Sequence, residues 1–569
     1  MKWVFEIYPK KARYITATVV AMLGDILDII PPILLGTMVD LFINNGFTHH
    51  VIPLAVSVLA FTLLSANLAY FGANASGYWR QDFTDRLKRK CYEKLNLLDQ
   101  SFYNKTGVGE LNTIMTSDQN QIGHVVHWII RSTIIDILRF FVVFIYLCFI
   151  NVPLSILILL PAPIIAFLSI KHMKKMEPLY DERRQERSNL NNYIQENIEG
   201  NKVVKSFASE KYEIDKFGKK NGLLKNKNLR VKYENINYDS KIIFLSEIME
   251  VLLLLFGGYL LMQGSITVGD ILIFSSLLWI LKMPFLNIGD TISEFQEFKI
   301  SKDRIQRLLD APIDVKNNGK LSLDYDEQEI IFKDVDVAFD ERYALKKINI
   351  KIEPGKTVAC IGQVGSGKST IARLVLRFID PTKGKVYIGD NNIKKYTLES
   401  LRKNIGYVSQ TPFLFSDTIR NNVNYGNTEL SEEEIISCLK KAKADYVFKY
   451  PDGLDTIIGE NGVSLSGGEK QRLSLARALA VKPKILILDD ITSALDIETE
   501  IEVTKNIENL DYDATKIIIA QKIFSVKNAD LILVFKDGKI VEQGTHTELL
   551  KLNGEYKNIY NIQKESYED

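Results

Sequence analysis

The clearest chemistry in the sequence belongs to the run Gly362-Gln363-Val364-Gly365-Ser366-Gly367-Lys368-Ser369. It matches the phosphate-binding pattern GxxxxGK[ST], in which backbone N–H groups turn inward around phosphate oxygens. The lysine adds positive charge beside the β- and γ-phosphates, and the serine hydroxyl can hold Mg²⁺. The apolar run 357–361 predicts a strand before the loop, and residues from Thr370 to Phe378 predict a helix after it. The sequence therefore predicts a site for a nucleotide and magnesium.

Two further segments suit the same chemistry. Asp489 ends the apolar run 485–488, a predicted strand, from which its carboxylate can reach Mg²⁺ through water. The run Leu465-Ser466-Gly467-Gly468-Glu469 opens a predicted helix, whose N-terminus offers N–H groups and a positive dipole to a phosphate. One domain cannot use two distant anion sites on one nucleotide, so these motifs predict two domains paired head to tail.

Six apolar segments precede these motifs, and each is long enough, at about 20 residues, to cross a bilayer as a helix. They are 14–43, 51–72, 128–150, 153–170, 242–262 and 271–288. The two long links, after the second and fourth segments, are rich in Lys and Arg, whereas the three short links contain neither. Because positive charge stays on the cytoplasmic side, both long links and both termini are predicted to be cytoplasmic. The helical composition of the long links predicts span helices that extend far into the cytoplasm.

Several predicted spans carry ionisable side chains: Asp25, Asp28, Arg131, Asp136, Arg139, Glu247 and Glu250. Hydrocarbon does not solvate such groups, so they face either a water-filled cavity or a partner charge. Two interpretations are open for the acids: a cavity that accepts cationic or polar cargo, or salt bridges between helices, for instance with Arg131 or Arg139. The pair Pro31-Pro32 predicts a kink in the first span.

Composition argues against several classes of protein. The formal net charge of +1 shows no basic excess for nucleic acid. Four cysteines without CxxC spacing predict buried thiols, not a disulfide framework or a zinc site.

We expect an all-α membrane domain with six spans and cytoplasmic extensions over 1–310, a polar linker over 311–328, and an α/β P-loop nucleotide-binding domain over 329–569.

Together these motifs resemble those of ATP-binding cassette (ABC) transporters of the exporter fold, half-transporters whose membrane part precedes the nucleotide-binding part. The resemblance covers nearly all 569 residues. It implies ATP and Mg²⁺ as cofactors and a multi-pass location in the plasma membrane. Residues 102–107 and 203–210 resemble the family's intracellular loops, which carry short coupling helices that press on the nucleotide-binding domains. A composition rich in Lys, Ile and Asn is typical of an AT-rich bacterial genome.

The resemblance also assigns roles to single residues. It implies that Phe339 stacks on adenine, that 362–370 bind the phosphates, and that Gln410 contacts Mg²⁺ together with Ser369 and Asp489. It implies that 465–469 contact ATP on the opposite domain. The run Ser493-Ala494-Leu495-Asp496 matches the D-loop, which crosses to the opposite site.

Two positions depart from the family pattern. Asp490 stands where a glutamate normally prepares the attacking water, and Gln521 stands where a histidine is expected. Aspartate is one methylene shorter, and misplacement by about an ångström can cost about a hundredfold in rate. Glutamine lacks the switchable imidazole. Because 465–469 are intact, the chain resembles the degenerate half of a heterodimeric bacterial multidrug-type exporter.

The predicted function is that of an ATP-driven transporter subunit with weak ATPase activity at its own site. Its partner would be a second half-transporter that carries the missing glutamate and histidine. Drug-like, lipid-like or peptide cargo is the family-level expectation, and import is an alternative direction. A second hypothesis is a homodimeric exporter with Asp490 as its working base. A third is a non-transporting, ATP-gated regulator of a separate membrane protein.

Overall fold

The computed structural model describes residues 2–46, 49, 51–323, 328–339, 342–459, 465–492 and 495–568. The chain divides into two compact units. The first comprises Met1–Leu97 and Thr106–Ala311, and the second comprises Leu98–Lys105 and Pro312–Asp569. Each is described by itself.

The first unit is helical wherever it has regular structure among its described residues. Its elements are α1 (Lys2–Ile7), α2 (Lys11–Leu27), α3 (Ile30–Asn45), α4 (Val51–Leu97), α6 (Val108–Thr113), the π-helix η1 (Ile114–Asp118), α7 (Gln119–His124), the π-helix η2 (Val125–Ile129), α8 (Ile130–Ile150), α9 (Val152–Ile158), α10 (Ala162–Glu199), α11 (Asn201–Ser206), α12 (Glu210–Met262), α13 (Val268–Leu286) and α14 (Ile288–Asp310).

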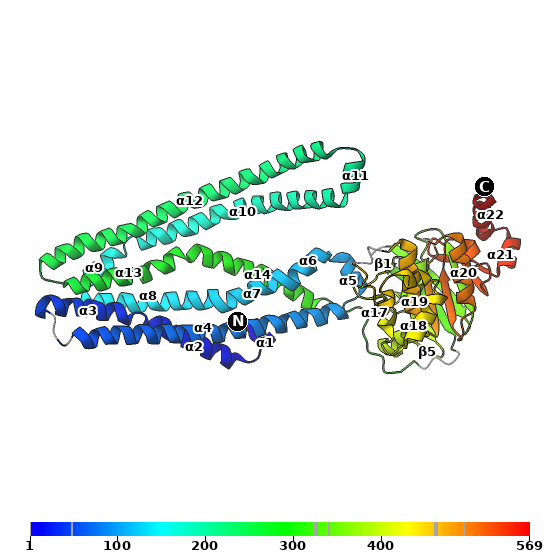
Figure 1. The fold of residues 1–569 in the computed structure, drawn as a ribbon, viewed down its shortest axis with the longest axis horizontal. Coiled ribbons are helices and arrows are strands. Elements are labelled where there is room, and N and C mark those ends of the chain that lie inside the picture. Colours follow the sequence, from blue (N-terminus) through cyan, green and yellow to red (C-terminus); the bar gives the residue numbers. More distant parts are fainter. Residues whose placement is uncertain are drawn as a thin grey trace. The chain divides into compact units, whose positions relative to one another are not determined.

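Six helical stretches of the described chain are long and apolar enough to cross a membrane, which confirms the predicted spans. They are Lys11–Asn45, Val51–Leu97, Val108–Ile150, Val152–Glu199, Glu210–Met262 and Val268–Leu286. The expected helical extensions are also present, because α4, α10 and α12 continue unbroken from their apolar segments into the basic links. Figure 1 shows the extended parts of α10 and α12 running together.

The first span is interrupted beside its two prolines. Helix α2 ends at Leu27, and α3 begins at Ile30 with Pro31 and Pro32 in its first turn. Proline has no N–H and its ring clashes with the carbonyl four residues earlier, so the hydrogen-bond ladder cannot continue through this point. The helix is therefore interrupted at the point where the sequence predicts a kink.

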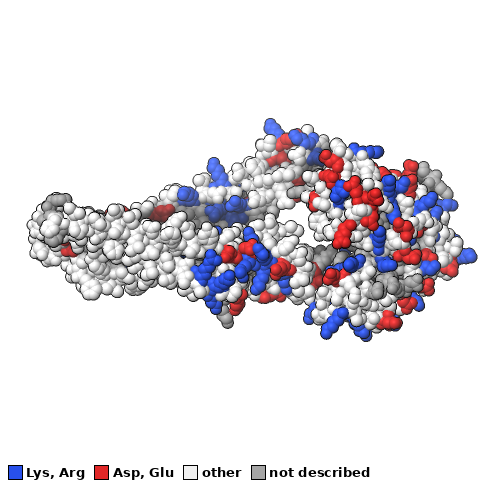
Figure 2. Space-filling view, turned by 60° about the horizontal axis from the view of Figure 1, so that its bottom comes forward, with Lys and Arg blue, Asp and Glu red and all other residues white. Residues whose placement is uncertain are grey.

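Small residues let the membrane helices approach closely, and apolar side chains fill the space between them. A Cβ built on Gly72 of α4 would lie 2.4 Å from the backbone nitrogen of Ala21 in α2. The buried core includes Phe274, Leu277 and Leu278 of α13. Figure 2 shows a broad zone of this unit with almost no charged residue at its surface, as a bilayer requires.

The second unit contains strands and shorter helices. The strands are β1 (Ile330–Phe339), β2 (Arg342–Ile352), β3 (Thr357–Gly362), β4 (Lys383–Ile388), β5 (Asn391–Asn392), β6 (Ile405–Val408), β7 (Ile485–Asp489), β8 (Thr515–Ile519), β9 (Leu531–Lys536) and β10 (Lys539–Gly544). The α-helices are α5 (Gln100–Lys105), α15 (Lys368–Val375), α16 (Leu398–Lys403), α17 (Ile419–Val423), α18 (Glu432–Lys441), α19 (Gly467–Ala480), α20 (Ile497–Glu508), α21 (His546–Leu552) and α22 (Glu555–Glu568). Short 3₁₀ turns are η3 (Ile393–Lys395), η4 (Asn424–Gly426), η5 (Asp445–Lys449), η6 (Gly453–Asp455) and η8 (Ile523–Ser525).

Two sheets organise the strands of this unit. Among the described residues, one sheet has the order β2-β1-β4-β5 and the other has the order β10-β9-β3-β8-β7-β6. In the second sheet, β9, β3, β8, β7 and β6 are parallel to one another, and β10 is antiparallel to β9. Parallel strands present their carboxyl ends at one edge, where α/β folds bind ligands. The loop after β3, Asp489 at the end of β7 and Gln521 after β8 all lie at that edge.

Candidate nucleotide site

The loop between β3 and α15 forms a cradle that a larger residue would fill. Gly365 and Gly367 have φ of +82° and +102°, a region that favours glycine. A Cβ on Gly367 would lie 2.4 Å from the carbonyl oxygen of Ala344. The loop therefore curls before the N-terminus of α15, and a helix N-terminus can bind an anion through its backbone N–H groups. The side chain of Val364 is 84% exposed on the loop, whereas Ser366 and Thr370 are buried.

Lys368 is folded into this cradle. Its Nζ donates hydrogen bonds to the carbonyl oxygens of Gly362 (2.7 Å) and Gln363 (2.8 Å). Burial lowers the pKa of the Lys368 ammonium, and the acidic groups nearby oppose that shift. A desolvated cation surrounded by oxygen acceptors fits a triphosphate, which offers negative oxygens in the same position.

Ser369 and Asp489 meet beside the cradle. The Ser369 hydroxyl donates to Oδ1 of Asp489 at 3.0 Å, and the Asp489 side chain is buried. Burial raises the pKa of Asp489, and the hydrogen bond from Ser369 lowers it in part. A hydroxyl and a carboxylate side by side are hard oxygen ligands of the kind that Mg²⁺ prefers. This arrangement fits the predicted magnesium position.

Asp490 is held by two amides. Its Oδ2 accepts a hydrogen bond from Nε2 of Gln521 at 2.9 Å and another from Nε2 of Gln410 at 3.1 Å. The residue is buried and has a left-handed φ of +52°. The two departures from the family pattern, Asp490 and Gln521, therefore contact each other directly.

The signature residues begin α19. Ser466 is the N-cap, and its Oγ accepts from the backbone N–H of Glu469 at 3.3 Å, while Glu469 Oε2 accepts from the Ser466 N–H at 2.7 Å. This capping box fixes the first turn of α19. Ser466 and Gly467 are exposed, whereas Leu465 is buried. The helix N-terminus is thus capped and exposed, and it can bind a phosphate.

The remaining predicted residues lie at the margins of the site. Phe339 ends β1 with its side chain 43% exposed. Asp496 is the N-cap of α20 and accepts from the Thr499 N–H at 2.9 Å, a contact that lowers the pKa of its carboxyl. Leu495 is buried. Ser493 and Ala494 of the predicted D-loop lie outside the described residues.

Comparison with known proteins decides the family. Residues 14–285 match the family model of the ABC transporter transmembrane region, and residues 345–493 match a second family model described as ABC transporter. The chain is 32% identical over 564 residues to the ABC transporter ATP-binding protein YknU of Bacillus subtilis, covering 98% of this chain and 96% of that protein.

The chain belongs to the ABC transporter family.

Three further similarities extend this result. An ATP-dependent lipid A-core flippase of Syntrophus aciditrophicus is 32% identical over 92% of this chain and 87% of its own length. A Staphylococcus aureus protein named for multidrug export is 31% identical over 98% of both chains. The structure of a bacterial Atm1-family ABC exporter with ATP bound superposes with a TM-score of 0.81 at 25% identity, over 97% of this chain and 98% of that one. The transporter therefore has the exporter fold, is a multi-pass membrane protein, and binds and hydrolyses ATP to drive transport.

The two segments of the transporter that are predicted to be intracellular loops each contain part of a short helix. Residues 102–107 overlap α5, and residues 203–210 overlap α11. Helix α11 leaves Val203 and the adjacent Phe207 largely exposed. These are the helices expected to act as coupling helices.

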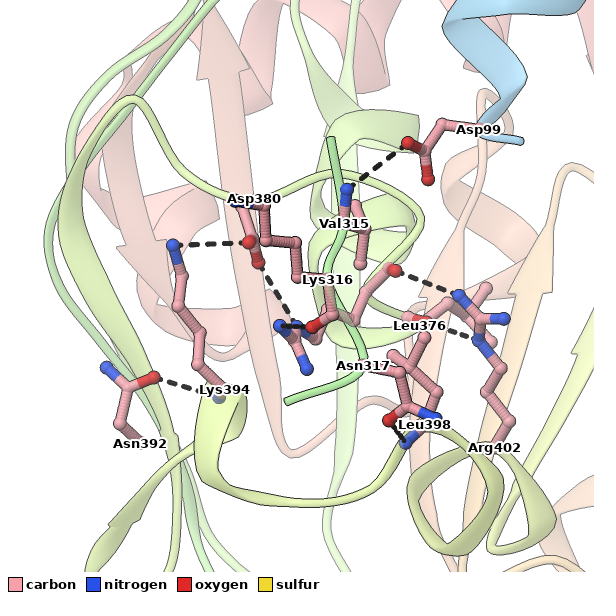
Figure 3. A network of polar contacts seen from close by, with 11 residues as sticks. Asp99, Val315, Lys316, Asn317, Leu376, Asp380, Asn392, Lys394, Leu398 and Arg402 are labelled. Atoms are coloured by element: carbon pink, nitrogen blue, oxygen red, sulfur yellow. Dashed lines mark hydrogen bonds and ion pairs between the residues drawn. The ribbon is translucent and has the colours of Figure 1, made fainter. Parts of the chain in front are cut away.

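Segment 98–105 is joined to the linker within the second unit (Figure 3). Asp99 accepts hydrogen bonds from the backbone N–H groups of Asp314 (2.6 Å) and Val315 (3.2 Å). The next residue of the linker is also bound: the side chain of Arg377 donates to the carbonyl oxygen of Lys316 at 2.9 Å. Arg377 lies two residues after the end of α15. The linker is thus fixed between Asp99 and the helix that follows the phosphate loop.

Four acids of the membrane spans form ion pairs. Asp25 pairs with Arg131 at 3.1 Å and Asp28 pairs with Arg139 at 3.0 Å, which is the salt-bridge interpretation of the sequence. Glu250 lies 3.0 Å and Glu247 lies 3.9 Å from Nζ of Lys282. Sequence reasoning did not single out Lys282, although a lysine within the apolar segment 271–288 is itself a signal of a buried charge that needs a partner.

The two arginine pairs predict unequal costs of disruption. Arg131→Gln leaves Asp25 unpaired where only 19% of its side chain is exposed, so we expect a loss of about 3 kcal/mol. Arg139→Gln is the matched control, because Asp28 is 50% exposed and we expect a smaller loss than for Arg131→Gln. Thermal unfolding in lipid nanodiscs measures both. Equal losses would show that burial does not govern these pairs.

Proposed function

We propose that this transporter is the ATP-holding half of a heterodimeric exporter. Its own site binds ATP but hydrolyses it slowly, and its signature helix completes the hydrolytic site of a partner half-transporter. One observation carries this proposal: Oδ2 of Asp490 accepts both the Gln410 and the Gln521 amide. A general base must direct a lone pair at its water, and proton abstraction is weakened when that oxygen already accepts two hydrogen bonds.

The other residues of the site retain what ATP binding requires. Lys368 and the loop N–H groups hold the phosphates, and Ser369, Asp489 and Gln410 are the proposed Mg²⁺ contacts. Bound ATP with Mg²⁺ supplies the phosphoryl group. Phe339 is proposed to stack on adenine. A site with intact binding groups and a weak base keeps ATP bound for longer. Such a site suits a half-transporter whose bound ATP holds the two nucleotide-binding domains together.

The signature residues supply the second part of the proposal. Residues 465–469 form an intact helix N-terminus with its cap, so they can stabilise the γ-phosphate of ATP bound to another chain. The partner is proposed to carry glutamate and histidine at the positions of Asp490 and Gln521. Closure of the two domains would be passed to the spans through α5 and α11.

The proposed cargo is a drug-like or lipid-like amphiphile, with peptides as a further class. The relatives named for lipid A-core flipping and multidrug export support this choice. Glu247 and Glu250 remain about half exposed although they pair with a buried lysine, so they are the better candidates for cavity residues, ahead of Asp25. The location proposed is a bacterial plasma membrane with both termini cytoplasmic.

ATP turnover by the chain purified alone in lipid nanodiscs tests the proposal. We expect a kcat below about 0.1 s⁻¹, at least a hundredfold under a typical enzyme value of about 10 s⁻¹. Cargo-stimulated turnover after pairing with a second half-transporter would separate a transporter from an ATP-gated regulator. Turnover near 10 s⁻¹ by the chain alone would instead support a homodimer with Asp490 as its base, since that is about the typical enzyme value.

A further inference from the structure

The C-terminal helix α22 packs beside the loop that carries Gln521. Its Tyr556, Ile559 and Tyr560 join an apolar cluster with Ala520 and Ile523, the residues that flank Gln521 and Lys522. The start of α22 is anchored separately. Glu542 accepts from the backbone N–H groups of Glu555 (2.5 Å) and Tyr556 (3.0 Å). The first turn of α22 is therefore held by contacts other than those of Gln563.

One side chain of α22 reaches the backbone on both sides of this loop. Nε2 of Gln563 donates to the carbonyl oxygen of Gln521 at 2.7 Å, and its Oε1 accepts from the N–H of Ile523 at 2.8 Å. The amide thus satisfies one acceptor and one donor that lie two residues apart. Residue 521 is then held at two points: Gln563 contacts its carbonyl oxygen, and Asp490 accepts from its side chain at 2.9 Å.

We propose that Gln563 is a positioning residue for residue 521, through which the C-terminal helix controls the geometry of the Asp490–Gln521 side of the nucleotide site. Both hydrogen bonds of the Gln563 amide go to main-chain groups of the loop, so it acts through the backbone of 521–523. The inference goes beyond the proposed function, because it concerns where residue 521 is placed and not how fast the site hydrolyses ATP.

The chemistry of glutamine suits this role better than that of similar residues. Asparagine is one methylene shorter and cannot reach both backbone groups from the same helix position. Glutamate keeps an acceptor for the Ile523 N–H but loses the donor and places an oxygen against the Gln521 carbonyl. A series of three substitutions therefore separates the two hydrogen bonds.

Hydrogen exchange in the full chain in lipid nanodiscs measures the effect directly. Gln563→Ala is expected to speed exchange of the Ile523 amide about tenfold, because that N–H loses its acceptor. Gln563→Asn should resemble alanine, and Gln563→Glu should protect this amide better than either. Asn561→Ala is the matched control, an exposed residue on the same helix. An exchange rate of the Ile523 amide in Gln563→Ala that stays within about twofold of the wild-type rate would overturn the proposal, because loss of a hydrogen bond should change the rate by more than about twofold.

A second readout tests action through residue 521. The dissociation rate of Mg²⁺-ATP is measured for Gln563→Ala, Gln521→Ala and the double variant. We expect each single change to speed dissociation, and the double variant to match Gln521→Ala within about twofold, because both act on one element. Fully additive effects would overturn the proposal. The hydrogen-exchange readout does not depend on slow hydrolysis, so its failure is distinguishable from failure of the proposed function.

Discussion

Asp490→Glu combined with Gln521→His is expected to raise ATP turnover of the chain alone by about a hundredfold. Glutamate extends the carboxylate by one methylene toward the water, and a placement error of about an ångström is enough to cost this factor. Histidine removes the Gln521 amide that now donates to Asp490 at 2.9 Å and supplies an imidazole in its place. Both changes act on the same hydrogen-bonded pair, so we expect their effects to be non-additive.

Steady-state phosphate release in lipid nanodiscs measures this gain, with each single variant beside the double one. Lys368→Ala in the double-variant background is the control, because loss of the ammonium in the phosphate loop must abolish any turnover that arises at this site. An unchanged rate in the double variant would mean that Asp490 and Gln521 do not limit hydrolysis.

Much of the fold follows from local sequence. The six spans, the helix interruption at Pro31-Pro32 and the helical extensions depend on hydropathy, proline chemistry and helix-forming composition within a single segment. The strand, loop and helix around 362–369 are likewise local, because the glycine spacing fixes the backbone and the flanking apolar runs fix the elements. These features need no knowledge of distant contacts.

Contacts between distant residues were not predictable in the same way. The sequence named Arg131 and Arg139 as partners for the acids, but which arginine meets which aspartate depends on the rotation of α2 against α8. Lys282 pairs with Glu250 from another span. Gln563 follows Gln521 by 42 residues and lies on an amphipathic helix whose polar residues look alike in sequence. Only the packing of α22 in the fold shows that Gln563 is the residue that contacts Gln521.

The asymmetry between the two anion sites can be tested with one substitution in each. Gly467→Asp places a carboxylate in the first turn of α19, where a negative charge favours the helix and folding should be preserved. The same charge repels a phosphate approaching that helix N-terminus. In a complex of this chain with its partner half-transporter, we expect turnover to fall about a hundredfold or more, the cost of removing one preorganised stabiliser of the transition state.

The matched variant in this chain's own site is Asp490→Asn, which removes the carboxyl charge but keeps an acceptor for the Gln410 and Gln521 amides. Suppose that hydrolysis occurs mainly at the site completed by 465–469. Asp490→Asn should then lower the turnover of the paired complex at least about ten times less than Gly467→Asp does, because only Gly467→Asp removes a stabiliser of the transition state at that site. Phosphate release by the two complexes at saturating Mg²⁺-ATP gives the comparison. Equal losses of turnover would mean that both composite sites hydrolyse ATP, because a substitution at a site that does not hydrolyse ATP would change turnover little.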